Sequence, residues 1–169
     1  FIISRKWVDE FINALHSSGI VKYGLKWVTS SRADNICKND ELIGDMADAG
    51  LLLLIVGFES FSPRVLKWFN KGVTVEQNFK AAEICHKHGV KVWANYILGI
   101  PTDTGWHKED DLMTVEGVLR VKPVHYSPAF YTPVHGSALY DFYKTNNLIV
   151  GDENTERLSN RGAMAPKVK

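Results

Sequence analysis

The sequence is poor in the features that mark disulfide-rich, metal-cysteine and membrane-spanning proteins. Its 169 residues include two cysteines, Cys37 and Cys85, which form no CxxC pair. They are too few for a disulfide framework, and we expect no metal site on these two residues alone. Free thiols favour a reducing compartment, so the expected location is cytoplasmic. No apolar run approaches the roughly 18 residues that would cross a membrane, so no membrane association is expected.

The sequence also lacks an excess of charge of either sign. It has 20 Lys and Arg against 19 Asp and Glu, a net charge of +1, which gives no electrostatic reason to expect nucleic-acid binding. No nucleophile elbow, phosphate loop, HExxH motif or GxGxxG motif is present. The hydrophobic fraction of 45% is that of an ordinary globular domain, so we expect one domain with a real core.

The N-terminus has neither an initiator methionine nor the pattern of a signal peptide, and it begins on Phe-Ile-Ile as if cut from a longer chain. Residues 1–150 are expected to form the domain. Residues 151–169 are polar and punctuated by glycine and proline, which predicts a tail or the start of a C-terminal extension.

Apolar periodicity predicts helices that alternate with strands. The expected helices cover residues 4–18, 39–49, 62–71, 74–88, 107–120 and 136–144. The expected strands cover residues 26–30, 51–60, 90–98 and 124–131. The continuous apolar run of 51–56 predicts a strand covered on both faces. The helix at 107–120 is expected to turn four residues inward: Leu112, Val115, Val118 and Leu119. The five tryptophans are expected to lie mostly in the core.

This order of elements predicts an α/β fold with a parallel sheet. Four strands are too few for a closed eight-stranded barrel, so an open or partial (β/α) barrel fits best, and a small doubly wound sheet is the alternative. In either fold the carboxyl ends of the strands carry the functional groups. Those ends are rich in Gly, Ser, Thr and charge here, which predicts one shared mouth for a polar ligand.

Three residues at these ends have simpler interpretations that we keep open. Arg32 has carboxylates nearby in the sequence and could pair with Asp34 or Asp9 at the surface. Lys71 closes the predicted helix after Glu59, where a cation suits the helix C-terminus. Asn95 could be a satisfied amide inside an apolar strand.

The motifs SRAD, VGFES, NKG, NYILGIP and PAFYTPVHGSALY, in this order, resemble the radical S-adenosylmethionine (SAM) enzymes over about residues 1–145. The resemblance is greatest to the subgroup with cobalamin-binding domains, which includes the anaerobic magnesium-protoporphyrin monomethyl ester cyclases. It implies the C-terminal strands and helices of a six-stranded partial (β/α) TIM-type barrel, in which 51–60 is the fourth strand. The CxxxCxxC loop that binds the family's 4Fe–4S cluster is absent, so the cluster ligands are expected outside this chain.

The resemblance also implies roles for individual residues. Glu59 matches a position that contacts the amino group or ribose of S-adenosylmethionine, and Lys71 matches one that pairs with its carboxylate. Asn95 matches a position near the ribose. The remaining cofactor-binding matches are Ser30, Arg32, Ser60 and the adenine turn Gly99, Ile100 and Pro101; the substrate matches are Tyr131 and His135.

In such an enzyme, reductive cleavage of S-adenosylmethionine gives a 5′-deoxyadenosyl radical that abstracts hydrogen from a small-molecule substrate, as in oxidative cyclases or methyltransferases. The resemblance implies a flavodoxin- or ferredoxin-type electron donor, and a cobalamin domain could lie upstream. The isolated chain is expected to be inactive and to self-associate through an exposed sheet edge. Two alternatives remain: a non-radical barrel lyase or hydrolase that uses Glu59 with Lys71 or Arg32, and a non-catalytic binding module.

Overall fold

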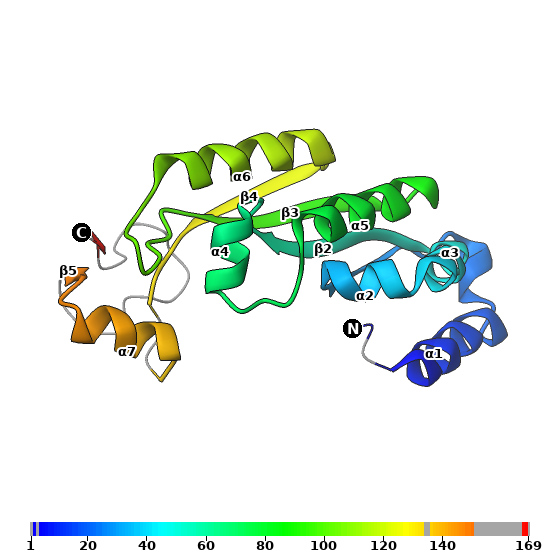
Figure 1. Cartoon of the computed structure of the whole chain (residues 1–169). Coiled ribbons are helices and arrows are strands. Elements are labelled where there is room, and N and C mark those ends of the chain that lie inside the picture. Colours follow the sequence, from blue (N-terminus) through cyan, green and yellow to red (C-terminus); the bar gives the residue numbers. More distant parts are fainter. Residues whose placement is uncertain (1, 3, 134–135, 151–166, 169) are drawn as a thin grey trace.

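A four-stranded parallel sheet in the order β1-β2-β3-β4 forms the centre of the computed structural model (Figure 1). The structure describes residues 2, 4–133, 136–150 and 167–168. The strands are β1 (Trp27–Ser31), β2 (Leu51–Glu59), β3 (Lys91–Leu98) and β4 (His125–Phe130). All four predicted strands are confirmed, and so is the parallel α/β class.

The helices follow the predicted order, with two additions, η1 and α2. They are α1 (Arg5–Ser17), a 3-10 turn η1 (Ile20–Tyr23), α2 (Ala33–Lys38), α3 (Asp40–Asp48), α4 (Pro63–Trp68), α5 (Val75–Lys87), α6 (Lys108–Val121) and α7 (Ala138–Thr145). The capping box of α5 is confirmed, because Thr74 Oγ1 accepts from Gln77 N and Gln77 Oε1 accepts from Thr74 N. Helix α2 was not predicted, since its six residues are too few to show a helical period.

The hydrophobic core lies on one face of the sheet. Along β2 the side chains of Leu54, Val56 and Phe58 are fully buried, whereas Ile55 and Gly57 on the opposite face are only partly buried. Helices α2 and α3 contact β2 on the buried side, and α5 and α6 contact β3. The prediction that β2 is covered on both faces is therefore wrong for the described residues. The second face is apolar but open, and it forms the floor of the site below.

Helix α6 turns a different face to the core from the one predicted. Its buried residues are Asp110, Thr114, Gly117, Val118 and Val121. Leu112, Val115 and Leu119 are exposed by 37% or more, so only Val118 of the predicted set points inward. Polar side chains lie on the inward face of α6 because they form hydrogen bonds to the loop after β2. Asp110 accepts from Ser62 Oγ at 2.5 Å, and the hydroxyls of Thr114 and Ser60 lie 2.7 Å apart in a hydrogen bond.

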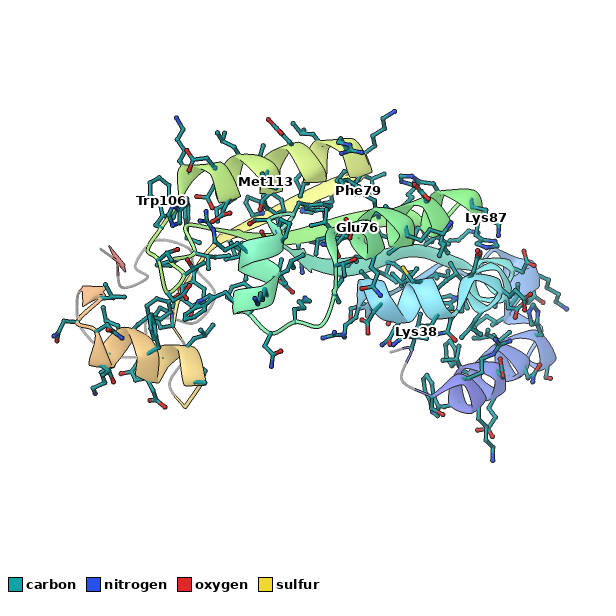
Figure 2. All side chains as sticks on the ribbon, viewed as in Figure 1. Lys38, Glu76, Phe79, Lys87, Trp106 and Met113 are labelled. Carbon is teal, nitrogen blue, oxygen red and sulfur yellow. The ribbon has the colours of Figure 1, made fainter. Side chains whose placement is uncertain are left out.

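The tryptophans are less buried than predicted. Trp7 is 49% and Trp106 52% exposed, and the other three are partly buried, so none lies fully in the core. Trp106 stands out at the surface near the start of α6 (Figure 2). Within the described residues, no helix is long and apolar enough to cross a membrane.

The C-terminal end of the described chain holds one further pairing. Strand β5 (Ile149–Val150) pairs antiparallel with β6 (Lys167–Val168). The predicted tail is thus partly a strand, while residues 151–166 and 169 lie outside the described residues.

Candidate functional site

A cleft of about 350 Å³ opens at the carboxyl ends of β1, β2 and β3. It is lined by Ser30, Ser31, Arg32, Asn35, Ile55, Gly57, Glu59, Lys71 and Asn95. Five of these are predicted cofactor-binding residues: Ser30, Arg32, Glu59, Lys71 and Asn95. Because parallel strands end at one edge of a sheet, residues more than sixty positions apart meet here.

An ion pair forms the wall of this cleft. Lys71 Nζ lies 2.5 Å from Glu59 Oε1 and also donates to the carbonyl of Gly57 at 2.9 Å. The side chains of Lys71 and Glu59 are 13% and 26% exposed, so the pair is mostly shielded yet open on one side. Among the described residues, Glu59 Oε2 accepts no hydrogen bond, which leaves one carboxylate oxygen for a ligand.

Lys71 does not sit at the helix end that the sequence predicted. Helix α4 ends at Trp68 with Phe69 as its C-cap, and Lys71 follows in the loop to α5. The helix-terminus interpretation of Lys71 is therefore wrong. The cation is placed instead by its bonds to Gly57 and Glu59.

Arg32 fixes that loop from the other side of the cleft. Its Nε donates to Asp34 Oδ1 at 2.9 Å, which confirms the predicted pairing, and its Nη2 donates to the carbonyl of Lys71 at 2.6 Å. Burial alone would raise the pKa of Asp34. The hydrogen bond and charge of Arg32, with help from Lys38, outweigh burial, and the pKa lies below its ordinary value. Arg32 thus joins the loop after β1 to the loop that carries Lys71.

Asn95 sits beside Gly57 in the β2–β3 register, on the open face of the sheet. Its side chain is partly buried and makes no hydrogen bond to any described residue. The interpretation of Asn95 as a satisfied core amide is therefore not supported. Its amide faces the cleft and can donate and accept there.

The structure does not bring every predicted residue to this cleft. Ser60 is buried against α6 through its bond to Thr114. Gly99 donates its backbone N–H to Asp111 Oδ1 at 3.0 Å and takes a φ of +68°, which favours glycine. Ile100 and Pro101 follow it and are buried, and the carbonyl of Pro101 accepts from the hydroxyl of Tyr143. These four residues pack around the strand ends, and none of them lines the cleft.

Of the two predicted substrate residues, one is described. The ring of Tyr131 packs between Phe69 and Tyr143, at centroid distances of 5.8 and 5.3 Å. Burial in this aromatic cluster raises the pKa of Tyr131 above its ordinary value. His135 lies outside the described residues.

Four residues of the cleft received no binding role from the sequence: Ser31 and Gly57, which were noted only as strand-end residues, and Asn35 and Ile55, which were not singled out. Gly57 carried a signal, since a glycine that interrupts a buried strand marks close approach of other groups. Asn35 lies in the unpredicted helix α2, directly after the SRAD motif. Ile55 gave no signal, because an apolar residue in a strand reads as core.

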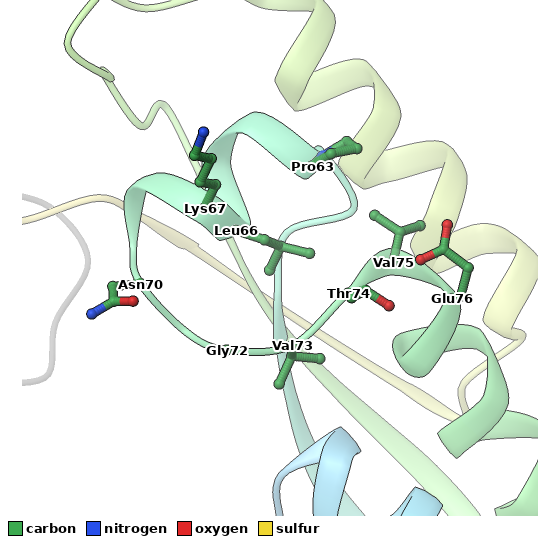
Figure 3. A pocket seen from close by; sticks show the side chains of 9 residues that line it. All are labelled: Pro63, Leu66, Lys67, Asn70, Gly72, Val73, Thr74, Val75 and Glu76. Carbon is green, nitrogen blue, oxygen red and sulfur yellow. The ribbon is translucent and has the colours of Figure 1, made fainter.

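A second pocket is larger, at about 470 Å³, and lies between α4, the loop after it and the start of α5 (Figure 3). Its lining includes Leu66, Val73 and Val75, with the side chains of Lys67, Asn70 and Glu76 at its edges. None of the predicted site residues lines it. We therefore take the smaller cleft, which gathers an anion, a cation and an amide, as the candidate site.

The described residues offer no place for an iron–sulfur cluster. They contain no group of three or more His, Cys, Asp or Glu side chains that could hold a metal ion. Cys85 is fully buried, and this burial raises the pKa of its thiol to about 12, which disfavours the thiolate that binds iron. The expectation that the cluster ligands lie outside this chain stays a prediction.

Comparison with known proteins identifies the family of the chain. The family model described as "Radical SAM superfamily" matches residues 4–114. An uncharacterized methyltransferase of Pyrococcus horikoshii is 27% identical over 150 residues, which are 89% of this chain and 31% of that protein. The anaerobic magnesium-protoporphyrin IX monomethyl ester cyclase of Rubrivivax gelatinosus is 28% identical over 138 residues, 82% of this chain and 24% of the cyclase.

A solved structure shares the fold. The radical S-adenosylmethionine methyltransferase TsrM of Kitasatospora setae, with cobalamin and an iron–sulfur cluster bound, superimposes with a TM-score of 0.61 at 17% identity. The match covers 73% of this chain and 22% of TsrM. The chain spans less than a third of the length of each of these three proteins.

Proposed function

Because the chain belongs to the radical SAM superfamily, we propose that its cleft binds the amino-acid end of S-adenosylmethionine. The whole protein would be an enzyme that cleaves this cofactor reductively. One observation carries the proposal: Glu59 and Lys71 stand 2.5 Å apart in a cleft that polar and charged residues line at the carboxyl ends of parallel strands.

The methionine moiety of the cofactor is a zwitterion, and the cleft offers the matching charges. Lys71 uses two of its three ammonium hydrogens on Glu59 and Gly57, so one remains for a carboxylate. Glu59 Oε2 can accept from an ammonium group. Charge-assisted bonds of this kind are stronger than neutral ones, so the pair can hold the zwitterion without coming apart.

The neighbouring residues fit the rest of the ligand. Asn95 presents an amide toward the cleft, as hydrogen bonding of a ribose diol requires. Gly57 has no side chain, which leaves room for the Glu59–Lys71 pair in the cleft. Ile55 gives that floor an apolar surface. The described residues therefore fit this cofactor.

When bound, S-adenosylmethionine would supply the reactive carbon that abstracts hydrogen from the substrate. The residues of this chain bind and orient it. Glu59 and Lys71 hold its charged end, Arg32 keeps the loop of Lys71 in place, and Asn95 faces its sugar.

The proposal extends to the whole protein. Its reaction is of the oxidative cyclase or methyltransferase type, as in the curated relatives. The whole protein uses a 4Fe–4S cluster and, as a member of the subgroup with cobalamin-binding domains, cobalamin. Both groups are held outside the described residues. Residues 1–150 form the radical SAM core domain, and the substrate is a small molecule. The proposal also includes a flavodoxin- or ferredoxin-type electron donor for the whole protein and a cytoplasmic location. The isolated chain is proposed to self-associate.

Binding and cleavage of S-adenosylmethionine by the full-length protein test this function. We expect the reduced, oxygen-free enzyme to release 5′-deoxyadenosine and methionine. We expect Glu59→Gln and Lys71→Met each to weaken S-adenosylmethionine binding about tenfold or more, as loss of a charge-assisted bond does. The matched controls are Lys80→Met and Glu83→Gln, which remove an exposed ion pair on α5 and should leave binding unchanged. A wild-type protein that neither binds nor cleaves S-adenosylmethionine would refute the proposal.

A further inference from the structure

Glu59 occupies an unusual backbone position. Its φ is +60°, in the left-handed region that non-glycine residues rarely adopt. The N–H of Ser60 donates to the carbonyl of Phe58 at 2.7 Å, which closes a three-residue turn around Glu59. The β2–β3 register shifts between Gly57 and Glu59 at the same point. This turn takes the carboxylate out of the regular alternation of the strand.

A single buried side chain holds both sides of that turn. Asn78 of α5 is completely buried, and its Nδ2 donates to the carbonyl of Ser60 at 3.0 Å and to that of Phe58 at 3.3 Å. These carbonyls flank Glu59 in the chain. Asn78 is itself fixed in place, because its backbone N–H bonds Thr74, the N-cap of α5.

We infer that Asn78 is a positioning residue for Glu59, an inference that rests on the proposed binding of S-adenosylmethionine by Glu59. The side-chain amide is suited to this task because one nitrogen carries two hydrogens, one for each carbonyl. Aspartate in its ionised form could donate neither bond, and a leucine would leave both carbonyls without this partner.

A second observation separates this role from ordinary core packing. The Oδ1 atom of Asn78 is buried and has no hydrogen-bond partner among the described residues. An unpartnered buried acceptor is unfavourable, and an apolar residue of similar size would avoid it. The amide is therefore not the choice that packing alone would favour, and its two donated bonds account for it.

A double-mutant cycle between Asn78 and Glu59 tests the inference. S-adenosylmethionine affinity is measured by equilibrium dialysis on the full-length, cluster-loaded protein for wild type, Asn78→Ala, Glu59→Ala and the double variant. We expect Asn78→Ala to weaken S-adenosylmethionine binding about tenfold when Glu59 is present. In the Glu59→Ala background, Asn78→Ala should have no further effect on the affinity. Equal losses in both backgrounds, or no loss in the wild type, would overturn the positioning role.

The same cycle separates this inference from the proposed function. If Glu59→Ala leaves affinity unchanged, the proposed clamp itself is wrong. If Glu59→Ala weakens binding and Asn78→Ala does not, only the positioning role is wrong.

A folding control and a local readout accompany the cycle. Ile84→Ala removes a buried side chain from the same helix, and it should lower stability while leaving affinity unchanged. Hydrogen exchange should rise at the Ser60 amide in Asn78→Ala and remain as in wild type for Ile84→Ala. Should Asn78→Ala not fold, Asn78→Leu keeps a branched side chain at this position and removes the donors, and it should show the same two effects. Unchanged exchange at Ser60 in a folded Asn78 variant would contradict the inference.

Discussion

Lys71 Nζ and Glu59 Oε1 lie 2.5 Å apart directly over the backbone of Gly57. A Cβ atom added to Gly57 would come within 2.6 Å of Glu59 Oε1 and 3.3 Å of Lys71 Nζ. The ion pair therefore occupies the space that any side chain at this position of β2 would need. Gly57, the glycine of the VGFES motif, is therefore required for the pair to take this position.

Gly57→Ala should displace the Glu59 carboxylate and weaken S-adenosylmethionine binding severalfold, with a small effect on folding. The reason is that the atoms in conflict are ends of side chains, which can move, and not backbone. Equilibrium dialysis of the full-length protein measures the affinity, and urea unfolding measures the stability. Leu53→Val, lower on the same strand face, serves as control. Unchanged affinity in Gly57→Ala would show that the position of the carboxylate does not matter.

Arg32→Lys should loosen the loop that carries Lys71 although it conserves charge. The guanidinium bonds Asp34 and the carbonyl of Lys71 at once, through two different nitrogens. A lysine ammonium is a single point of charge and cannot reach both partners in this geometry. We expect faster hydrogen exchange in residues 69–74 and a severalfold loss of S-adenosylmethionine affinity. Exchange and affinity equal to those of wild type would mean that the loop holds its position without Arg32.

Sequence reasoning recovered the architecture because the signals were local. The capping box at Thr74 and Gln77 and the apolar run of β2 each specify their element from a few neighbouring residues. Four residues of the cleft, Ser30, Arg32, Glu59 and Asn95, lie at or near predicted strand ends, which meet in any parallel sheet, and Lys71 was named only through the family resemblance. Their exact partners could not be named, since the contact of Arg32 with Lys71 depends on a loop whose path no local pattern sets.

Helix α6 shows why the remainder escaped prediction. Its apolar residues Leu112, Val115 and Leu119 have helical spacing, so they indicated an inward face. The face that packs is decided instead by the loop after β2, which needs Asp110 and Thr114 as partners for its buried polar groups. Satisfying buried donors outweighs burying these three apolar side chains, and the sequence of one helix does not contain that information.

Gly117→Ala should destabilise the protein although it replaces a glycine within a helix. In an exposed helix this change would gain about 1 kcal/mol. Here the new Cβ would lie 2.2 Å from Cγ of Phe61, whose ring is buried and packed against Phe58 and Phe79. Overpacking of this kind costs about 1–3 kcal/mol, so we expect a net loss. Urea unfolding measures it, and Phe61→Leu should restore part of the loss in the double variant. A gain in stability from Gly117→Ala would show that the ring has room to move.

Asp34 should contribute stability that disappears in acid. Its folded pKa lies below the ordinary value of 3.8, because Arg32 and Lys38 favour the charged form. A group of this kind stabilises the fold above its unfolded pKa and loses that contribution as the pH falls through the folded pKa. The difference in unfolding free energy between wild type and Asp34→Asn should therefore be largest near neutral pH and shrink below about pH 4. The exposed Asp103→Asn serves as control. A difference that stays constant from pH 6 to pH 3 would contradict this role.

Cys85 should be inert in the folded protein. Burial raises the pKa of its thiol from 9.0 to about 12, so at pH 8 its thiolate fraction is about a thousandfold below that of a free thiol. Cys37, which is only partly buried, also has a raised pKa, from burial first and the nearby charge of Asp34 second. Iodoacetamide pulses followed by mass spectrometry of the two peptides should label Cys37 slowly and Cys85 much more slowly. In urea both should react at one rate, and equal labelling in the native protein would mean that α5 opens far more readily than its buried face indicates.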